Sequence, residues 1–179
     1  APARNVLVRN CHMRRGHGAV VVGSEISSGV QNLAVDRCLM QDTDRGFRIK
    51  TRRGRGASSV VDGVALSNIV MERVLAPFVV NMYYYCDPDG HCQQVWDKAP
   101  RPVDGGTPRI GAIRCTNITC TDAGYSGVFL YGLPESPVES FVLHRVSISF
   151  AANAPAGLPA MMDGLEPVSI LAVGYADEQ

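Results

Sequence analysis

The sequence has no surplus of charge of either sign, no long apolar run and few aromatic residues. Its 179 residues carry 17 Lys and Arg against 17 Asp and Glu, and aromatic residues make up only 7%. Broad binding to nucleic acid or acidic membranes needs a surplus of cations, so the composition argues against both. No apolar segment approaches the roughly 18 to 20 residues of a membrane-spanning helix. We therefore expect no nucleic-acid and no membrane partner, and a local site for any electrostatic function.

The sequence also lacks linkers and long helix-forming stretches. No Ser- and Gly-rich segment divides the chain, so we expect residues 1–179 to form a single unit. The start, APARNVLV, lacks the basic and then apolar plan of a signal peptide, which predicts a mature or trimmed chain. The 18 Gly and 11 Pro are spread throughout, and Val is abundant. This composition favours many short strands joined by turns.

A recurring pattern of alternating apolar residues, ending in a polar residue and a small or apolar one, runs along the chain. Its copies are VLVRNC (6–11), LAVDRC (33–38), VALSNI (64–69), AIRCTNI (112–118) and FVLHRVSI (141–148). The first two copies lie 27 residues apart, the next 31, and only the third and fourth are separated by a longer interval. Such a period fits one coil of a parallel β-solenoid with three short strands per turn.

Further strands are expected between the copies of the pattern. They are bounded by Gly or Pro and cover 19–22, 47–51, 78–85, 127–131 and 169–173. A β-sandwich is the alternative, because Asp-Gly pairs typical of hairpin turns occur at Asp62, Asp89, Asp104 and Asp163. A sandwich has no reason to show the longer period, so the solenoid is favoured.

The six cysteines leave the redox compartment open. Cys11 and Cys38 end equivalent strings and are expected to stack as small buried residues. Short-loop disulfides could link Cys86 to Cys92 or Cys115 to Cys120, but neither spacing specifies a bond. A metal site at Cys86, His91 and Cys92 with a nearby Asp lacks paired ligand spacing, so a turn-rich surface loop is favoured. We expect no metal and no cofactor.

One segment of this neutral chain is strongly positive. Between Asp44 and Arg55 lie six cations: Arg45, Arg48, Lys50, Arg52, Arg53 and Arg55. If 47–51 is a strand, Arg48, Lys50 and Arg52 point to one face and Phe47, Ile49 and Thr51 to the other. Like charges two residues apart on a strand repel, so this row must be solvated, paired with carboxylates, or placed to bind an anion. The fork of Arg suits bidentate binding of a carboxylate.

Two further features are candidates for a site beside these cations. His17 lies between Gly16 and Gly18, and flanking glycines let a ligand approach the backbone closely. Tyr83 and Tyr85 follow an expected strand and would share one face of it. Aromatic faces of this kind stack on sugar rings, or else form a rim of the core.

Taken together, these residues resemble the polygalacturonase family of glycoside hydrolases, which cleave the galacturonic-acid chains of pectin on a right-handed parallel β-helix. The motifs are Gly16-His17-Gly18, then Arg48-Ile49-Lys50 about thirty residues on, then a Tyr at the end of a strand. Similarity extends through NVLVRNC, GHGAVVVGSE, TDRGFRIKTRRGRG and VALSNIV, and YGLPESPVES with PAMMDGLEP resembles the bacterial exo-acting branch. The resemblance implies an all-β, right-handed parallel β-helix.

The same resemblance implies roles for four residues. Arg48 and Lys50 are expected to bind a galacturonate carboxylate beside the scissile bond, Tyr85 to support that subsite, and His17 to be a catalytic residue. The implied partner is a galacturonic-acid-containing oligo- or polysaccharide, and the implied location is secreted or periplasmic. The motifs leave open whether the action is endo or exo and which pectic substrate is cleaved.

The printed sequence departs from the family in lacking its three catalytic aspartates, in an Asn-Thr-Asp motif and an Asp-Asp pair before the GHG motif. Only 16 residues precede His17. Inverting hydrolysis needs two carboxyl groups, which His or Arg cannot replace. Asp42 and Asp44 are expected to serve a turn instead. We therefore expect the C-terminal part of a longer enzyme, truncated at its N-terminal end and nearly inactive alone.

An open first coil would expose unpaired strand edges and apolar core, and no N-terminal helix is expected to cap it. A second copy or a missing N-terminal part is expected to cover it. Two other functions stay open: a non-catalytic β-helix that binds acidic glycans, and a structural solenoid whose ends pair.

Overall fold

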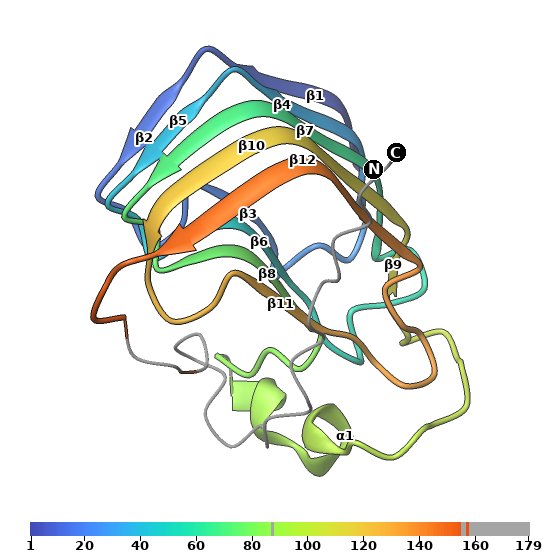
Figure 1. Cartoon of the computed structure of the whole chain (residues 1–179). Coiled ribbons are helices and arrows are strands. Elements are labelled where there is room, and N and C mark those ends of the chain that lie inside the picture. The colour runs from blue at the N-terminus through green and yellow to red at the C-terminus, as the bar shows by residue number, and fades with distance from the viewer. Residues whose placement is uncertain (87, 155–156, 158–179) are drawn as a thin grey trace, which may run out of the picture.

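The computed structural model describes residues 1–86, 88–154 and 157, and these residues form a parallel β-helix (Figure 1). The strands are β1 (Ala3–Arg9), β2 (His12–Arg14), β3 (Val20–Val22), β4 (Val30–Asp36), β5 (Leu39–Gln41), β6 (Arg45–Lys50), β7 (Val60–Glu72), β8 (Ala76–Asn81), β9 (Arg109–Ile110), β10 (Ala112–Ala123), β11 (Val128–Tyr131) and β12 (Ser140–Phe150). Two short helices, the 3-10 helix η1 (Pro88–His91) and α1 (Gln93–Trp96), lie between β8 and β9.

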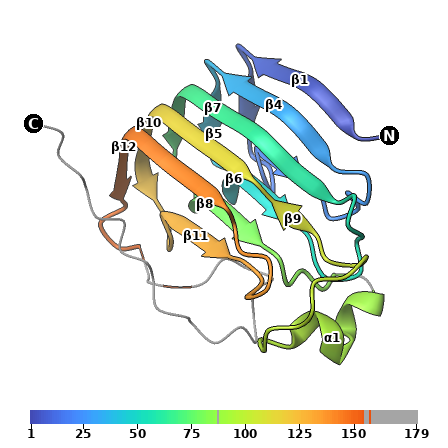
Figure 2. The same ribbon diagram turned by 90° about the vertical axis from the view of Figure 1, so that its right-hand side faces the viewer.

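The strands form two sheets in which all ladder pairings are parallel. One sheet has the order β1-β4-β7-β10-β12, with β2, β5 and β9 beside that path, and the other has the order β11-β8-β6-β3. Successive coils stack side by side along both sheets (Figures 1 and 2). The predicted β-helix is therefore confirmed, and the β-sandwich alternative is wrong, because hairpins would have produced antiparallel ladders.

Each of the first four coils contains the three strand segments that the repeat predicts. The second coil runs through β4, β5 and β6, and in the third coil β7 takes the place of the first two segments. The first half of β7 pairs with β4 and its second half with β5. The longer interval before the fourth copy of the pattern contains η1 and α1, which lie beneath β8 and β11 in Figure 1.

A stack of residues with left-handed backbone makes the bend between the first two segments of every coil. All of its members have φ in the left-handed region, and they are Asn10, Arg37, Asn68, Asn117 and Arg145. Each copy of the repeated sequence pattern contains one of them. Asn tolerates this conformation better than most residues, and Asn117 donates from Nδ2 to Oδ1 of Asn68 at 3.2 Å.

The φ angles at these five corner positions run from 51° to 55°. A second stack of left-handed residues lies after the second segment of the coils. Its members have φ between 52° and 57°, and they are Arg15, Asp42, Arg73 and Asp122. The residues on either side of the corners pair in register, as Thr116 does with Ser67 and Ile118 with Ile69, so the bends are superimposed along the solenoid. The corners therefore fix the shape of every coil.

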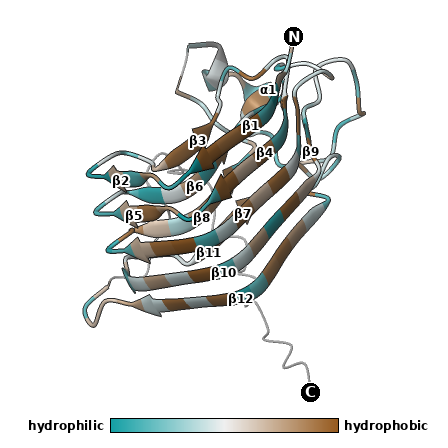
Figure 3. Cartoon of the chain, turned by 90° about the horizontal axis from the view of Figure 1, so that it is seen from above, coloured by the Kyte–Doolittle hydropathy of each residue, from teal (hydrophilic) through white to brown (hydrophobic). Residues whose placement is uncertain are grey.

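The core lies between the two sheets and is built from stacked apolar side chains. Val35, Leu66 and Cys115 occupy the same register on β4, β7 and β10, and none is more than 1% exposed. The alternation of apolar and polar bands along these strands is visible in Figure 3. On the edge strand β1, Val6 is 37% exposed, whereas its stacked neighbour Leu33 is 5% exposed. The first coil therefore leaves core positions open to solvent.

The sequence and the structure differ in one strand and one cysteine. The strand expected over 78–85 ends at Asn81, where Oδ1 of Asn81 accepts the N–H of Tyr83 at 2.7 Å and turns the chain out of the sheet. The strand expected over 169–173 lies outside the described residues. Cys38 is buried as expected, but Cys11 is exposed because it lies on the outermost coil. All six cysteines belong to the described part of the chain, and each is a free thiol.

Within the described residues, no helix is long and apolar enough to cross a membrane.

Candidate functional site

Three neighbouring strands of the second sheet bring the predicted site residues together. His17 precedes β3, Arg48 and Lys50 lie on β6, and the three consecutive tyrosines follow β8. Val21, Arg48 and Val79 share one register across these strands, so the segments that flank them meet at one side of the solenoid. The fold thus places close together residues that are about thirty positions apart in the chain.

Arg48 is a buried cation. Its side chain is 1% exposed, and its Nε atom has no hydrogen-bond partner. Across residues 1–86 and 88–154, Arg48 forms no salt bridge with a carboxylate. Burial, and then repulsion by Arg45, lower the pKa of the Arg48 guanidinium below its ordinary value. An arginine that is removed from water without a counterion is costly, so an anionic ligand would stabilise this site.

His17 connects Arg48 to a carboxylate. Its Nδ1 atom lies 2.7 Å from Oδ2 of Asp44, and its Nε2 atom lies 3.2 Å from Nη1 of Arg48. The short contact with a carboxylate requires a proton on Nδ1, which leaves the lone pair of Nε2 to accept a hydrogen bond from Arg48. Nη1 of Arg45 also reaches Oδ2 of Asp44, at 3.3 Å. Asp44 therefore holds the ring of His17 in one tautomer and one orientation.

Lys50 is the accessible cation of the site. It is half-buried, and its Nζ atom lies 5.0 Å from the ring centroid of Tyr84. The guanidinium carbon of Arg48 lies 5.6 Å from the same centroid, so one aromatic ring contacts both cations. Burial, and then repulsion by Arg48, lower the pKa of the Lys50 ammonium. Such cation–π contacts hold the two charges in place without neutralising them.

The structure separates the tyrosines that were expected to share a face. Tyr83 is buried and its ring packs on Tyr131, Tyr84 lies against Arg48 and Lys50, and Tyr85 packs on His91 and Trp96. The reason is that β8 ends before these residues, so the alternation of a strand does not apply to them. Tyr84 was missed because its role depends on the turn after Asn81, which the sequence pattern did not reveal.

Burial also decides between the interpretations of the cation row. Phe47, Ile49 and Thr51 face the core as expected and are fully buried. Arg48 is 1% exposed and Arg52 is 4% exposed, so a simple solvated face is wrong for two of the three cations of the row. The cations instead form a largely buried cluster at one side of β6.

Arg53 binds a carboxylate with two of its donors. Its Nε and Nη2 atoms donate to Oε1 and Oε2 of Glu135 at 2.6 and 2.9 Å. The remaining donors of Arg53 bind the backbone carbonyls of Gln94, Asp97 and Ala99. We term these contacts the Arg53 clamp. It fastens the segment after α1 to the body of the solenoid, which the spacing of the sequence could not reveal.

The loop that contains two cysteines gives no support for a metal site. Cys86 and Cys92 are exposed free thiols, and the ring of His91 packs on Tyr85. In the part of the chain that the structure describes, no group of three or more His, Cys, Asp or Glu side chains is placed to hold a metal ion.

Comparison with known proteins finds polygalacturonases among the similar sequences. The chain is 40% identical over 81 residues to an endo-polygalacturonase of Pectobacterium carotovorum subsp. carotovorum, covering 45% of this chain and 19% of that protein. It is 26% identical over 150 residues to a polygalacturonase of Persea americana, covering 82% of this chain and 30% of that protein. An exo-poly-alpha-D-galacturonosidase of Dickeya chrysanthemi is 27% identical over 99 residues, covering 55% of this chain and 16% of that protein.

A solved polygalacturonase from Erwinia carotovora ssp. carotovora superposes with a TM-score of 0.54 at 24% identity, covering 88% of this chain and 36% of that structure. This likeness concerns the fold, and the chain spans only a minor part of each of these relatives. The family model of glycosyl hydrolases family 28 matches residues 1–156, most of the chain. The chain therefore belongs to glycosyl hydrolases family 28.

Proposed function

We propose that this chain carries the uronate-binding part of a pectin-degrading glycoside hydrolase that, when complete, cleaves α-1,4 galacturonosyl bonds with inversion. Arg48 and Lys50 bind the carboxylate of a galacturonate unit beside the scissile bond. Tyr84 holds the two cations, and Tyr85 borders the same subsite. His17 lies at the reacting bond, oriented by Asp44.

The observation that carries this proposal is the buried charge of Arg48, which forms no salt bridge with a carboxylate in the part of the chain that the structure describes. A guanidinium that is 1% exposed and has an unpaired Nε is a costly arrangement for structure alone. The half-buried ammonium of Lys50 shares the ring of Tyr84 with Arg48. Two cations held by one aromatic ring suit a planar, singly charged carboxylate better than an isolated surface charge would.

The acid and the base of the reaction are proposed to come from coils that precede this chain in the complete protein. Hydrolysis with inversion needs a protonated carboxyl group on one side of the bond and a carboxylate that activates water on the other. Asp44 is already held by His17 and Arg45, so it is poorly suited to either role. The same preceding coils, or a second copy, would cover the open core beside Val6.

Binding of galacturonate oligosaccharides tests the site without requiring catalysis. Lys50→Gln should weaken binding of trigalacturonate about tenfold, because a charge-assisted hydrogen bond contributes about 1.5 kcal/mol. Arg114→Gln is the matched control, since it removes a cation from an exposed position of β10 in the other sheet. Isothermal titration calorimetry that finds equal losses for the two variants, or none, would contradict the proposal.

Activity of the isolated chain tests the second half of the proposal. Without a pair of catalytic carboxyl groups, the 179-residue chain should release no measurable reducing sugar from polygalacturonate. Release by this chain would overturn the assignment of the acid and base to preceding coils. The candidate carboxyl groups would then be those of Asp36, Asp42 and Asp44. Gel filtration that shows a stable, well-folded monomer of about 19.2 kDa would contradict the proposed covering of the first coil.

A non-catalytic β-helix that binds acidic glycans is the second candidate. The observation in its favour is that the carboxylate beside His17 is committed to His17 and Arg45, while Arg48 and Lys50 form no salt bridge within the described residues. The two candidates predict the same binding but differ in the complete gene product, because only the enzyme requires an Asn-Thr-Asp and an Asp-Asp within the coils before Ala1. Since the proposed substrate is a polymer outside the cell, either protein would act in the periplasm or after secretion.

A further inference from the structure

The single tryptophan of the chain lies in a ring cluster that shares only Tyr85 with the site described above. Trp96 ends α1, and its side chain is 47% exposed. Its ring lies 5.7 Å from that of Tyr85 and 5.7 Å from that of His91, and the latter two rings are 5.5 Å apart. All three contacts are edge-to-face, which braces the indole from the side. A large aromatic surface is thus held in a fixed orientation while much of it remains in solvent.

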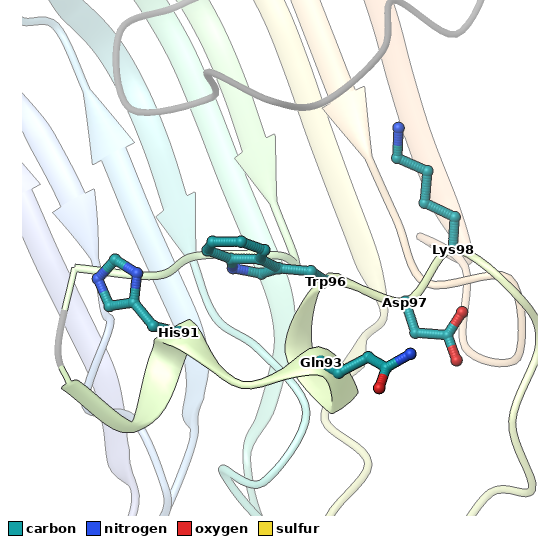
Figure 4. A pocket seen from close by; sticks show the side chains of 5 residues that line it. All are labelled: His91, Gln93, Trp96, Asp97 and Lys98. Atoms are coloured by element: carbon teal, nitrogen blue, oxygen red, sulfur yellow. The ribbon is translucent and has the colours of Figure 1, made fainter.

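The exposed indole borders an open hollow of about 580 Å³. Figure 4 shows the five side chains around this hollow, which are His91, Gln93, Trp96, Asp97 and Lys98. They combine an aromatic surface with an amide, a carboxylate and an ammonium group. This mixture suits a ligand that has both an apolar face and polar substituents, as a sugar ring does.

The charges around the hollow favour an acidic ligand. Oδ2 of Asp97 accepts two hydrogen bonds from Arg101, and Oδ1 accepts the backbone N–H of Ala99 at 2.9 Å. These bonds lower the pKa of the Asp97 carboxyl and compensate its charge. Lys98 is exposed and forms no salt bridge in the described part of the chain. Its ammonium is therefore the charge that a ligand in the hollow would meet.

The hollow is connected to the cation site through two consecutive residues. Tyr84 contacts Arg48 and Lys50, and the next residue, Tyr85, contacts Trp96. Since consecutive Cα atoms are about 3.8 Å apart, a residue of the cation site and a residue of the ring cluster lie next to each other in the backbone. A chain of sugars that is held at Lys50 can therefore extend toward the indole.

The Arg53 clamp keeps the hollow in place. The guanidinium of Arg53 binds the carbonyls of Gln94, Asp97 and Ala99, which flank Trp96 in the sequence. Only Val95 of α1 is buried, so a helix of one turn would have little else to fix it. A binding surface that is held rigid before the ligand arrives loses less conformational entropy on binding.

We propose that the hollow at Trp96 is an additional subsite for a uronate ring of the same acidic chain that Arg48 and Lys50 hold. Trp96 stacks on the apolar face of the ring, and Lys98 pairs with its carboxylate. This inference rests on the proposed function, because it assigns a second unit of the same ligand.

The fluorescence of the sole tryptophan tests the proposal directly. Trigalacturonate and longer oligomers should change the emission of the 179-residue chain, whereas monogalacturonate, which fills the Arg48 and Lys50 site first, should not. In calorimetry, Trp96→Ala should weaken binding of the longer oligomers about three- to tenfold and leave the monomer unaffected. Val103→Ala is the control, since Val103 is also exposed and lies outside the hollow.

The outcomes separate this proposal from the function on which it rests. One outcome is that Lys50→Gln loses binding while Trp96→Ala binds oligomers of every length as the wild type does and tryptophan emission does not change. That combination would overturn the additional subsite alone. Unchanged binding in Lys50→Gln would overturn the proposed function. If Trp96 stacks on the sugar, Trp96→Phe should bind longer oligomers more tightly than Trp96→Ala does. Equal affinities of the two variants, with unchanged circular dichroism, would contradict stacking.

Discussion

Replacing Glu135 by Gln should destabilise the protein strongly, because it removes the counterion of a buried arginine. Arg53 and Glu135 have side chains that are 4% and 5% exposed. Breaking a buried ion pair by removing one partner costs about 3 to 5 kcal/mol. Arg53 keeps its three carbonyl acceptors, so we expect a value at the lower end, about 3 kcal/mol. For a chain of this size that corresponds to a fall in Tm of about 6 to 12 °C.

The chain offers a matched control in the same loop. Glu139 binds Arg109 through the same two pairs of atoms, Nε with Oε1 and Nη2 with Oε2, but these side chains are 47% and 48% exposed. Glu139→Gln should leave the urea midpoint of unfolding unchanged within error, because an exposed ion pair is screened by water and salt. Equal urea midpoints for the Glu135 and Glu139 variants would refute the reasoning.

The effect of Glu135 should also depend on pH in a defined direction. Hydrogen bonds from Arg53 lower the pKa of the Glu135 carboxyl from its ordinary value of 4.5. The folded state therefore holds this proton less tightly than the unfolded state, and the stabilisation is fully present above pH 4.5. It is lost as the pH falls through the lower, folded-state pKa. The difference in stability between the wild type and Glu135→Gln should shrink with acidification, and a difference that stays constant would contradict the pairing.

Three further outcomes follow from the corners, the core thiols and the histidine. Asn68→Ala should lower the free energy of unfolding by about 1 kcal/mol more than Asn68→Gly, because both variants lose the side-chain hydrogen bonds of Asn68 but only Ala is strained by a left-handed backbone; urea denaturation that ranks them in reverse order would contradict this. Burial raises the pKa of both Cys115 and Cys120 to about 12, so a thiol reagent at neutral pH should label neither in the native protein; rapid labelling of these two would show that the core is open. Asp44→Asn should weaken trigalacturonate binding severalfold by releasing the ring of His17, and calorimetry that shows no change would remove Asp44 from the site.

The solenoid could be predicted because its signal is periodic. Each copy of the apolar pattern contains the residue that turns the corner, such as Asn68 and Asn117, so the period of the sequence is the period of the coil. The positions of Arg48 and Lys50 followed from strand alternation and from the resemblance to polygalacturonases. Local patterns and repeats of this kind are properties that a single sequence carries.

The contacts that the sequence could not predict are those between segments with no fixed period. Tyr83 and Tyr85 were expected to share one face of a strand, but the strand ends early, at Asn81, whose side chain accepts the N–H of Tyr83. Tyr84 is therefore the tyrosine that contacts the two cations. Arg53 and Glu135 are 82 residues apart, and nothing in their spacing indicates that they meet. Asp44 lies in a turn, as expected, but the preceding coil also places His17 against it.

Recognition of a uronate carboxylate by Arg48 and Lys50 is most directly tested by removing the charge from the ligand and from the protein together. Calorimetry would compare trigalacturonate with its methyl ester, each against the wild type and Lys50→Gln. We predict that esterification weakens binding to the wild type about tenfold and has a clearly smaller effect on Lys50→Gln, because the two changes remove the same ion pair. Equal affinity of the wild type for the acid and the ester, or binding of neither, would contradict the account.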